Sequence, residues 1–389
     1  MRRVRAAFIP LVDSAPLIAA ERMGFAREEG VALELTRERS WATLRDKLAV
    51  GAVEAAHLLA PITVASTLGL GNPKPPMVAL MGLSMNGNAI SVSAALYDEM
   101  REVAPIAGPD DLLGKARALC AVTVARRASG RSRLTFGIVH TFSPHHYELR
   151  YLLAAGGVDP DRDVDLVVVP PPYVVDHLRA GHIDGFCVGA PWTSLGLNEG
   201  LSRVIAVKAQ IWNRGPEKVL GMRAAAADAD PDLAGRLIRA VSRGAAYADD
   251  PANHEALSQM LAEEAVLAMD PAPIADSLAG RVPLDVSAGA PIADYVFFGR
   301  DGAGFPWQSH ALWFYAQMVR WGQAAHDPSA AKAAASAYRP DLYRAAFAPG
   351  DVALPAADRR VEAGDAFFDG HAFDPSDIDG YVSGFQLPR

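Results

Sequence analysis

The sequence predicts an α/β protein built from two lobes, and three observations support this fold class. The chain has 389 residues, about twice the length of a typical domain, which favours two hydrophobic cores. Half of the residues are apolar and 21% are charged, as in ordinary globular proteins. Strand and helix patterns alternate over the first part of the chain, which is typical of mixed, mostly parallel sheets.

The first alternating set starts close to the N-terminus. The apolar segment 4–9 predicts a strand, and Ser14 is expected to cap a helix that runs to about Glu29. Further elements expected in this set are strands over 31–35, 55–59 and 77–83 and a helix over 40–50.

The second alternating set begins near residue 109. Its clearest helix covers 146–155, because Gly156 and Gly157 follow it and glycine commonly ends helices. A strand over 164–169 is followed by three consecutive prolines, which stop it. The remaining elements expected here are helices over 109–125, 173–180 and after Pro191, and strands over 134–139 and 185–188.

The last part of the chain, from Pro231, has a mainly helical pattern. Helices are expected over 233–248, 255–269 and 307–321. Apolar and aromatic side chains recur at helical spacing in the third of these, which predicts a packing helix rather than a cofactor site. The last forty residues are rich in Asp, Gly, Ala and Pro, so we expect extended chain on the surface.

Two alternating sets suggest a chain that crosses twice between lobes. The crossings are expected near 87–92 and near 217–222, where short polar or glycine-containing stretches separate the two sets. Lobe I then comprises 1–88 and 220–389, and lobe II comprises 89–219. A cleft between two such lobes is a common location for a small-molecule site.

Composition and motifs exclude several classes of function. A net charge of −8 and a pI near 5.7 argue against a broad basic face, so we expect no direct nucleic-acid binding. The chain has no GxSxG elbow, and the loop 108–115 lacks the spacing and the following Ser or Thr of a phosphate-binding loop. No apolar run reaches the length of a membrane span. We therefore expect no enzyme activity, no cofactor and no membrane insertion.

Cysteines and histidines give no clear metal site. Cys120 and Cys187 are expected to be small buried residues, although a single disulfide stays open. His140, His145 and His146 lie close together without a zinc-binding spacing. They could cap a helix, face solvent or face an anion, and we expect no metal.

Seven segments, in order along residues 1–225, together indicate a family. They are Ser-Trp-Ala-Thr-Leu-Arg-Asp at 40–46, Ala-Ala-His-Leu-Leu-Ala-Pro at 55–61, Asn-Gly-Asn-Ala-Ile-Ser at 86–91, Leu-Arg-Tyr-Leu-Leu-Ala-Ala-Gly-Gly-Val-Asp-Pro at 149–160, Val-Val-Pro-Pro-Pro at 168–172, Phe-Cys-Val-Gly-Ala-Pro-Trp at 186–192 and Pro-Glu-Lys at 216–218. With these segments the chain resembles the nitrate- and bicarbonate-binding proteins of ABC-transporter type. The resemblance implies a periplasmic-binding-protein-like (type II) clamp of two α/β lobes.

The resemblance also implies a ligand site at Trp41, Asn88, His145, Gly189 and Lys218. All five offer hydrogen-bond donors, which suits nitrate or nitrite because these anions only accept. Asn88 departs from the family pattern, where nitrate binders carry a longer Gln. Relatives that bind bicarbonate resemble this layout with an acidic group and calcium near position 218, so Lys218 favours nitrate or nitrite. Taken singly, each residue also fits a structural role, such as packing for Trp41 or a tight turn for Gly189.

Two functions fit such a site. The N-terminus, Met-Arg-Arg-Val-Arg-Ala-Ala-Phe-Ile-Pro, lacks the long apolar core of a secretory signal, so we expect a cytoplasmic protein. The cytoplasmic branch of the family looks like the NasS-type nitrate/nitrite sensors, which hold a NasT-type RNA-binding antiterminator until ligand releases it. The main hypothesis is such a sensor, and the alternative is the substrate-binding component of a nitrate ABC transporter. An enzyme related to thiamine-precursor synthesis is a distant third.

Overall fold

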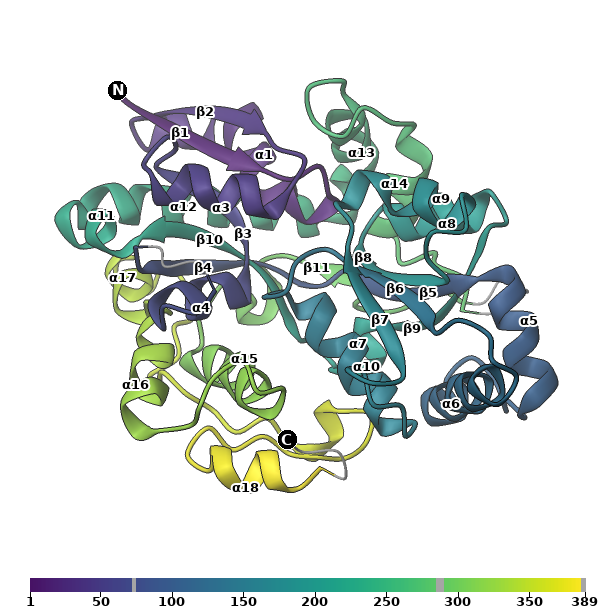
Figure 1. The fold of residues 1–389 in the computed structure, drawn as a ribbon. Helices are drawn as coiled ribbons and strands as arrows, with labels where there is room; N and C mark the ends of the chain where they lie inside the picture. The colour runs from purple at the N-terminus through teal and green to yellow at the C-terminus, as the bar shows by residue number, and fades with distance from the viewer. Residues whose placement is uncertain (72–74, 285–289, 386–389) are drawn as a thin grey trace.

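The computed structural model describes residues 1–71, 75–284 and 290–385, which form two β-sheets surrounded by helices (Figure 1). The six-stranded sheet has the order β11-β4-β10-β3-β1-β2, and the five-stranded sheet has the order β7-β6-β8-β5-β9. The strands of the first sheet are β1 (Arg2–Phe8), β2 (Val31–Arg37), β3 (Ala55–Leu59), β4 (Met77–Asn86), β10 (Pro216–Arg223) and β11 (Val296–Phe297). Those of the second are β5 (Asn88–Ser93), β6 (Leu134–Ile138), β7 (Val164–Val168), β8 (Gly185–Gly189) and β9 (Ser202–Val207).

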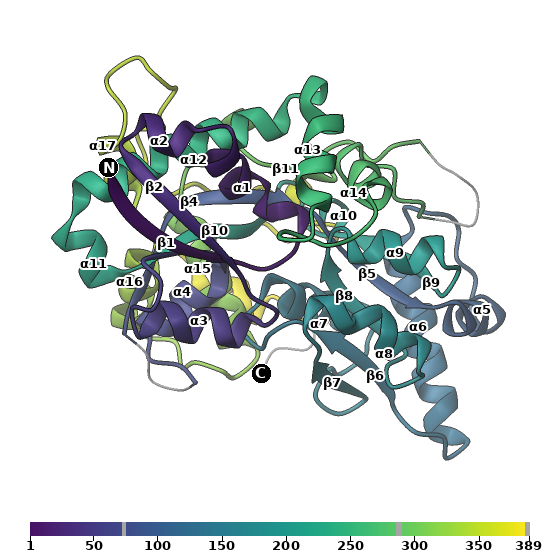
Figure 2. The same cartoon turned by 90° about the horizontal axis from the view of Figure 1, so that it is seen from above.

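Helices surround both sheets (Figures 1 and 2). The helices that precede β10 are α1 (Ala15–Arg22), α2 (Phe25–Glu28), α3 (Trp41–Ala49), α4 (Ala60–Thr67), α5 (Ala94–Val103), α6 (Leu112–Ala128), α7 (Pro144–Ala155), α8 (Val174–Arg179), α9 (Trp192–Asn198) and α10 (Lys208–Ile211). Those that follow it are α11 (Ala224–Ala229), α12 (Pro231–Asp249), α13 (His254–Ala262), α14 (Pro271–Leu278), α15 (Gln308–Arg320), α16 (Pro328–Ser336), α17 (Pro340–Ala345) and α18 (Ile378–Ser383). Short 3₁₀ turns occur at Val12–Ser14, Pro171–Tyr173, Pro251–Asn253, Arg300–Gly302 and Gly364–Ala366.

The predicted α/β class with two mixed sheets is confirmed, but the balance of strand directions differs from expectation. Among the described residues, four strand pairings are parallel and five are antiparallel. The antiparallel pairings all involve β5, β10 or β11. The chain enters both β5 and β10 from a strand of the other sheet, directly from β4 into β5 and from β9 through the short helix α10 into β10. Neither connection is the crossover within one sheet that joins parallel neighbours. A strand–helix alternation in sequence does not record this difference.

The first crossing between the sheets is a tight connection from β4 to β5. Asn86 and Gly87 both have positive φ, 59° and 85°, and a Cβ on Gly87 would lie 2.9 Å from the side chain of Val296. Only glycine fits such a position without strain. Asn86 also binds the second crossing, because its backbone N–H and side-chain oxygen pair with the backbone of Gly215. That crossing runs through α10 and ends at Pro216, earlier than the expected 217–222, so 216–219 lie in the first sheet.

Several helix boundaries differ from those that the apolar periodicity predicted. The helix expected to run to Glu29 is broken at Gly24, which has a φ of 82°. Ser14 does not cap it with its side chain, because its hydroxyl donates to the carbonyl of Leu11 at 2.8 Å. Ser40 and Ser143 do cap α3 and α7 through their side chains. The helix expected over 255–269 ends at Ala262.

The C-terminal segment, residues 350–385, lies on the surface as expected. It also contacts α15, beside the six-stranded sheet, and α7, beside the five-stranded sheet. Figure 1 shows it in yellow beside α15, with α18 packed on that helix. The indole N–H of Trp313 in α15 donates to Tyr381 at 3.0 Å, and Tyr151 in α7 donates to Asp369 at 2.8 Å. The segment therefore joins α7 of one lobe to α15 of the other.

Candidate functional site

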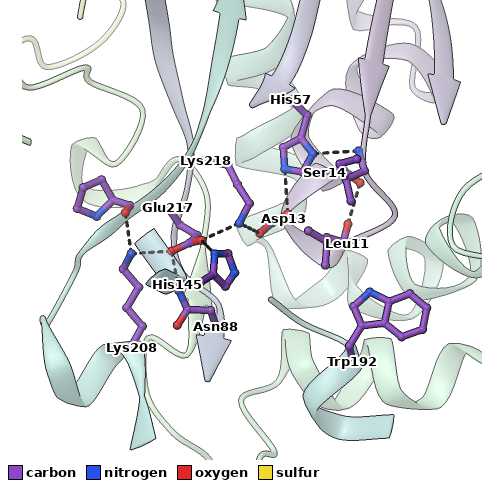
Figure 3. A network of polar contacts seen from close by, with 12 residues as sticks. Leu11, Asp13, Ser14, His57, Asn88, His145, Trp192, Lys208, Glu217 and Lys218 are labelled. Atoms are coloured by element: carbon purple, nitrogen blue, oxygen red, sulfur yellow. Dashed lines mark hydrogen bonds and ion pairs between the residues drawn. The ribbon is translucent and has the colours of Figure 1, made fainter. Parts of the chain in front are cut away.

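A cluster of buried charged side chains lies where the strands of the two sheets meet (Figure 3). Three segments of the chain supply its core. Asp13 follows β1, Glu217 and Lys218 begin β10, and His145 lies at the start of α7, all with exposed fractions of 2% or less. Buried charges require partners, because removing a charge from water without one is costly. The partners therefore define the site.

Lys218 lies between two carboxylates (Figure 3). Its Nζ is 2.8 Å from Oδ2 of Asp13 and 2.7 Å from Oε1 of Glu217. Burial alone would lower the pKa of Lys218, but the two carboxylates outweigh it and raise the pKa. Burial acts in the opposite direction on Asp13, yet Lys218 and His57 hold the pKa of Asp13 well below its usual value. The ammonium and both carboxylates are charged at neutral pH.

His57 in β3 fixes the other oxygen of Asp13. Its Nε2 lies 2.9 Å from Oδ1 of Asp13, and its Nδ1 accepts the backbone N–H of Ile9 at 3.4 Å. Burial lowers the pKa of His57, so the ring is neutral and its Nε2–H donates to Asp13. Asp13 is therefore held from two sides.

A second lysine completes the cluster on the α7 side. The Nζ of Lys208 lies 2.6 Å from Oε1 of Glu148, 2.6 Å from Oε2 of Glu217 and 2.7 Å from the carbonyl of Pro216. Burial raises the pKa of Glu148 to about 7, and the charge of Glu217 adds to this effect. The two lysines instead lower the pKa of Glu217 against its burial. The cluster thus holds two ammonium groups, two carboxylates whose pKa is lowered and one carboxyl group whose pKa lies near 7.

The structure brings the five residues predicted from the sequence together around this cluster. The ring centre of Trp41 lies 5.5 Å from Nζ of Lys218 and 5.3 Å from the ring of His57. Nδ1 of His145 lies 3.3 Å from Oε1 of Glu217. A Cβ on Gly189 would lie 3.4 Å from Oδ2 of Asp13 and 3.7 Å from Nε2 of His145. All five converge on the contact between Asp13, Lys218 and Glu217.

Two ring nitrogens at this point are buried and have neither a hydrogen-bond partner nor an ion-pair partner among the described residues. They are Nε1 of Trp41 and Nε2 of His145. Burial lowers the pKa of His145 to about 3, so its ring is neutral, and its Nδ1 lies 3.3 Å from Oε1 of Glu217. The indole N–H of Trp41 is therefore a buried donor without a partner among the described residues.

Asn88 is placed in the cluster, but its amide is not available in the way we expected. Its Nδ2 donates to Glu148 at 2.9 Å and to Glu217 at 2.7 Å, which uses both hydrogens. Its oxygen lies near the thiol of Cys187, 3.9 Å away. In this structure the amide of Asn88 therefore offers no free donor to an anion, contrary to our expectation, and instead bridges the two carboxylates.

Five members of the cluster were not predicted from the sequence. They are Asp13, His57, Glu148, Lys208 and Glu217. His57 and Glu217 lie inside the family-like segments 55–61 and 216–218, and Asp13 is an isolated acidic residue after an apolar strand. An isolated charge within an apolar stretch was the available signal.

The remaining histidines and cysteines have local roles or none. His140 accepts the backbone N–H of Phe142, and Nδ1 of His146 lies 2.6 Å from the carbonyl of Thr141. Cys120 and Cys187 are both free, so the disulfide left open by the sequence is absent. Over residues 1–71, 75–284 and 290–385, we find no group of three or more His, Cys, Asp or Glu arranged to hold a metal ion. None of the helices in those ranges is long and apolar enough to cross a membrane.

Comparisons with known proteins agree with this architecture. The model of the NMT1-like family matches residues 1–262. The nitrate/nitrite binding protein NrtA of Synechococcus elongatus is 33% identical over all of this chain and 87% of its own length. The bicarbonate transport ATP-binding protein CmpC of the same species is 34% identical over 81% of this chain and 44% of its own length. The crystal structure of the periplasmic nitrate-binding protein NrtA from Synechocystis superposes with a TM-score of 0.88 at 28% identity, over 100% of this chain and 99% of that one. The chain therefore belongs to the NMT1-like family, as a relative of the nitrate- and bicarbonate-binding proteins of ABC-transporter type that its sequence resembles.

Proposed function

We propose that this protein binds nitrate or nitrite between its lobes and serves as the substrate-binding component of an ABC transporter. One observation carries the proposal. The buried ammonium of Lys218, the unpartnered indole N–H of Trp41 and the ring of His145 meet at a closed site between the two sheets. Two relatives that match the whole of this chain, at 33% and 31% identity, are named nitrate/nitrite binding proteins, which supports the choice of ligand.

The geometry also constrains how such a ligand binds. The site residues are almost fully buried, so the lobes must open before an anion enters and close afterwards. Nitrate has four heavy atoms, which limits its affinity to about 6 kcal/mol, or roughly tens of micromolar. Full enclosure is therefore needed for useful binding, and a two-lobed clamp provides it.

The site contains acceptors as well as donors, which bears on the choice between nitrate and bicarbonate. Asp13 and Glu217 place carboxylate oxygens beside Lys218, whereas we expected from the sequence a site made only of donors. These oxygens could accept the hydroxyl of bicarbonate. The choice between the anions must therefore be measured directly.

The sensor function expected from the sequence stays a prediction that uses the same site. It adds a cytoplasmic location and a NasT-type RNA-binding antiterminator, which would bind one lobe arrangement and leave when the anion favours the other. Co-purification with and without millimolar nitrate tests it. A bound RNA-binding protein that nitrate releases would support the sensor over the transporter component.

Calorimetry with nitrate, nitrite and bicarbonate at one pH and ionic strength tests the proposed ligand. We expect saturable binding of nitrate or nitrite and at least tenfold weaker binding of bicarbonate. An exposed arginine outside the site, changed in Arg162→Gln, provides the control and should leave all three affinities unchanged. Tighter binding of bicarbonate than of nitrate and nitrite would contradict the proposal.

A further inference from the structure

A second cavity, away from the interlobe site, contains a buried and unpaired guanidinium. Arg320 lies at the end of α15 and is 2% exposed. Its Nε and Nη1 are enclosed and have no hydrogen-bond partner within the described ranges. Burial lowers the pKa of Arg320 to about 10, which leaves it protonated at neutral pH. The charge of Asp369 favours the protonated form from a distance, but within the described ranges no carboxylate binds Arg320 directly, which is unusual for a buried cation.

Aromatic rings hold this guanidinium in place. Its central carbon lies 3.6 Å from the ring centre of Phe385, 4.5 Å from that of Trp321 and 5.1 Å from that of Tyr151. Stacking on rings offsets part of the cost of burial, but it leaves the N–H groups in the guanidinium plane unused. Those groups are the ones that bind carboxylates.

The cavity beside Arg320 measures about 500 Å³ and lies between the C-terminal segment and the helices α6 and α7. A second arginine, Arg117 on α6, also lines it and makes no hydrogen bond or ion pair with any residue the structure describes. The acidic residue of the cavity, Asp369, is already engaged by Tyr151 and by the ring of His371, 3.1 Å away. The cavity therefore presents two cations that make no direct ion pair with a described residue, since Asp111 and Asp369 act on Arg117 and Arg320 only through their charge.

We propose that Arg320 and Arg117 form a second binding site, for a small organic carboxylate. A guanidinium matches a carboxylate in shape and charge and pairs with it through two parallel hydrogen bonds. The apolar walls, Leu113, Tyr151 and Phe385, suit a short hydrocarbon or aromatic body. A larger or polar ligand would leave these walls uncompensated.

The cavity is distinct from the interlobe site, but helix α7 contributes residues to both. Tyr151, Ala154 and Ala155 in the second half of α7 line the cavity, whereas His145 and Glu148 near its start belong to the buried charge cluster. The other wall belongs to the C-terminal segment, which packs on α15. A bound carboxylate would therefore contact α7 and the C-terminal segment together.

Titration of the whole chain with 4-fluorobenzoate, followed by ¹⁹F NMR, tests the site. The titration is run with and without saturating nitrate, so that the interlobe site is occupied in one arm. We expect saturable binding in both arms, at least tenfold weaker in Arg320→Met and about threefold weaker in Arg117→Gln. Arg162→Gln, an arginine outside the cavity, should bind as the unchanged protein does.

The two arginine variants keep the test decisive. Arg320→Met removes a packed side chain and can disturb the C-terminal segment, but Arg117 is exposed and its replacement leaves the packing intact. Absence of saturable binding, or equal affinity in the unchanged protein and Arg117→Gln, would overturn the proposal and leave Arg320 as a stacking residue only. Binding that nitrate abolishes would instead assign the probe to the interlobe site, and would also overturn it.

Discussion

The Nζ of Lys218 lies 2.8 Å from Oδ2 of Asp13, and both side chains are buried. The residue expected to hold an anion is therefore already neutralised by the protein. An incoming anion must share the ammonium with Asp13 and Glu217, so the site selects by charge balance as well as by shape. This balance leads to measurable consequences.

Replacement of Lys218 by Met should lower both the stability of the protein and its affinity for nitrate. It removes the ammonium that Asp13 and Glu217 share and leaves these buried carboxylates with His57 and Lys208 as their remaining partners, so we expect a loss of about 3–5 kcal/mol in the free energy of unfolding. We also expect nitrate binding to weaken by about 3 kcal/mol or more. The double variant Asp13→Asn/Lys218→Met should recover part of the stability and none of the binding. Denaturant unfolding and calorimetry measure the two effects, and unchanged nitrate affinity in Lys218→Met would refute its role.

The pH dependence of binding should follow Glu148. Its pKa of about 7 in the folded protein, above the ordinary value of 4.5, means that it is neutral below pH 7 and charged above. The charged form adds a negative charge to the cluster, so nitrate affinity should fall several-fold between pH 6 and pH 8. Because the folded state binds the proton more tightly, the contribution of Glu148 to stability should also decrease from about pH 4.5 to pH 7.

Glu148→Gln provides the control for that dependence. It cannot ionise, so its nitrate affinity should vary much less over the same pH range, whatever its absolute value. Calorimetry at several pH values compares the two proteins. An equally steep change in Glu148→Gln would assign the titration to another group.

Trp41→Phe should weaken nitrate binding at little cost in stability. The indole Nε1–H has no partner in the closed structure, so its loss leaves no protein group unsatisfied. If it donates to the anion, affinity should fall by about 1–3 kcal/mol. Trp192→Phe is the matched control, because the Trp192 indole donates to the carbonyl of Pro10 at 3.2 Å. That variant should lose about 1 kcal/mol of stability and keep its affinity.

Gly189→Ala tests whether this glycine leaves room for the ligand or only for the chain. Gly189 is not among the glycines with positive φ, and an added methyl group would make ordinary contacts with Asp13 and His145. The fold should therefore tolerate alanine within about 1 kcal/mol. The methyl group would nevertheless occupy space beside the ammonium of Lys218, so nitrate affinity should drop at least tenfold. Equal affinity in a stable variant would return Gly189 to a purely structural role.

Sequence patterns predicted part of this site and missed the rest for physical reasons. Trp41, His145, Gly189 and Lys218 lie in family-like segments, and the structure brings them together. Buried carboxylates could not be expected, because an isolated Asp or Glu is normally exposed unless a partner is known. The partner of Asp13 is more than two hundred residues away in sequence. The environment of a charge is set by the fold, so it is not visible in a local pattern.

The fold was limited in a similar way. The segment that starts at Asn88 follows Gly87 and contains Asn and Ser, which favour a turn, and it was expected only as a crossing. In the structure it is β5, paired with β8 and β9 on either side. Tertiary pairing thus overrides local preference. The helix boundaries set by Gly24 and by Ala262 depend on individual backbone conformations that periodicity does not report.

The connection at Asn86 and Gly87 leads directly into Asn88, whose amide bridges Glu148 and Glu217. Any swing of one lobe about this joint must turn that amide and disturb the pairing of both acids. The side chain of Asn88 therefore links the connection between the sheets to the charge cluster of the proposed anion site. Substitutions at positions 86–88 should therefore change the dissociation rate of the anion more than they change its equilibrium affinity.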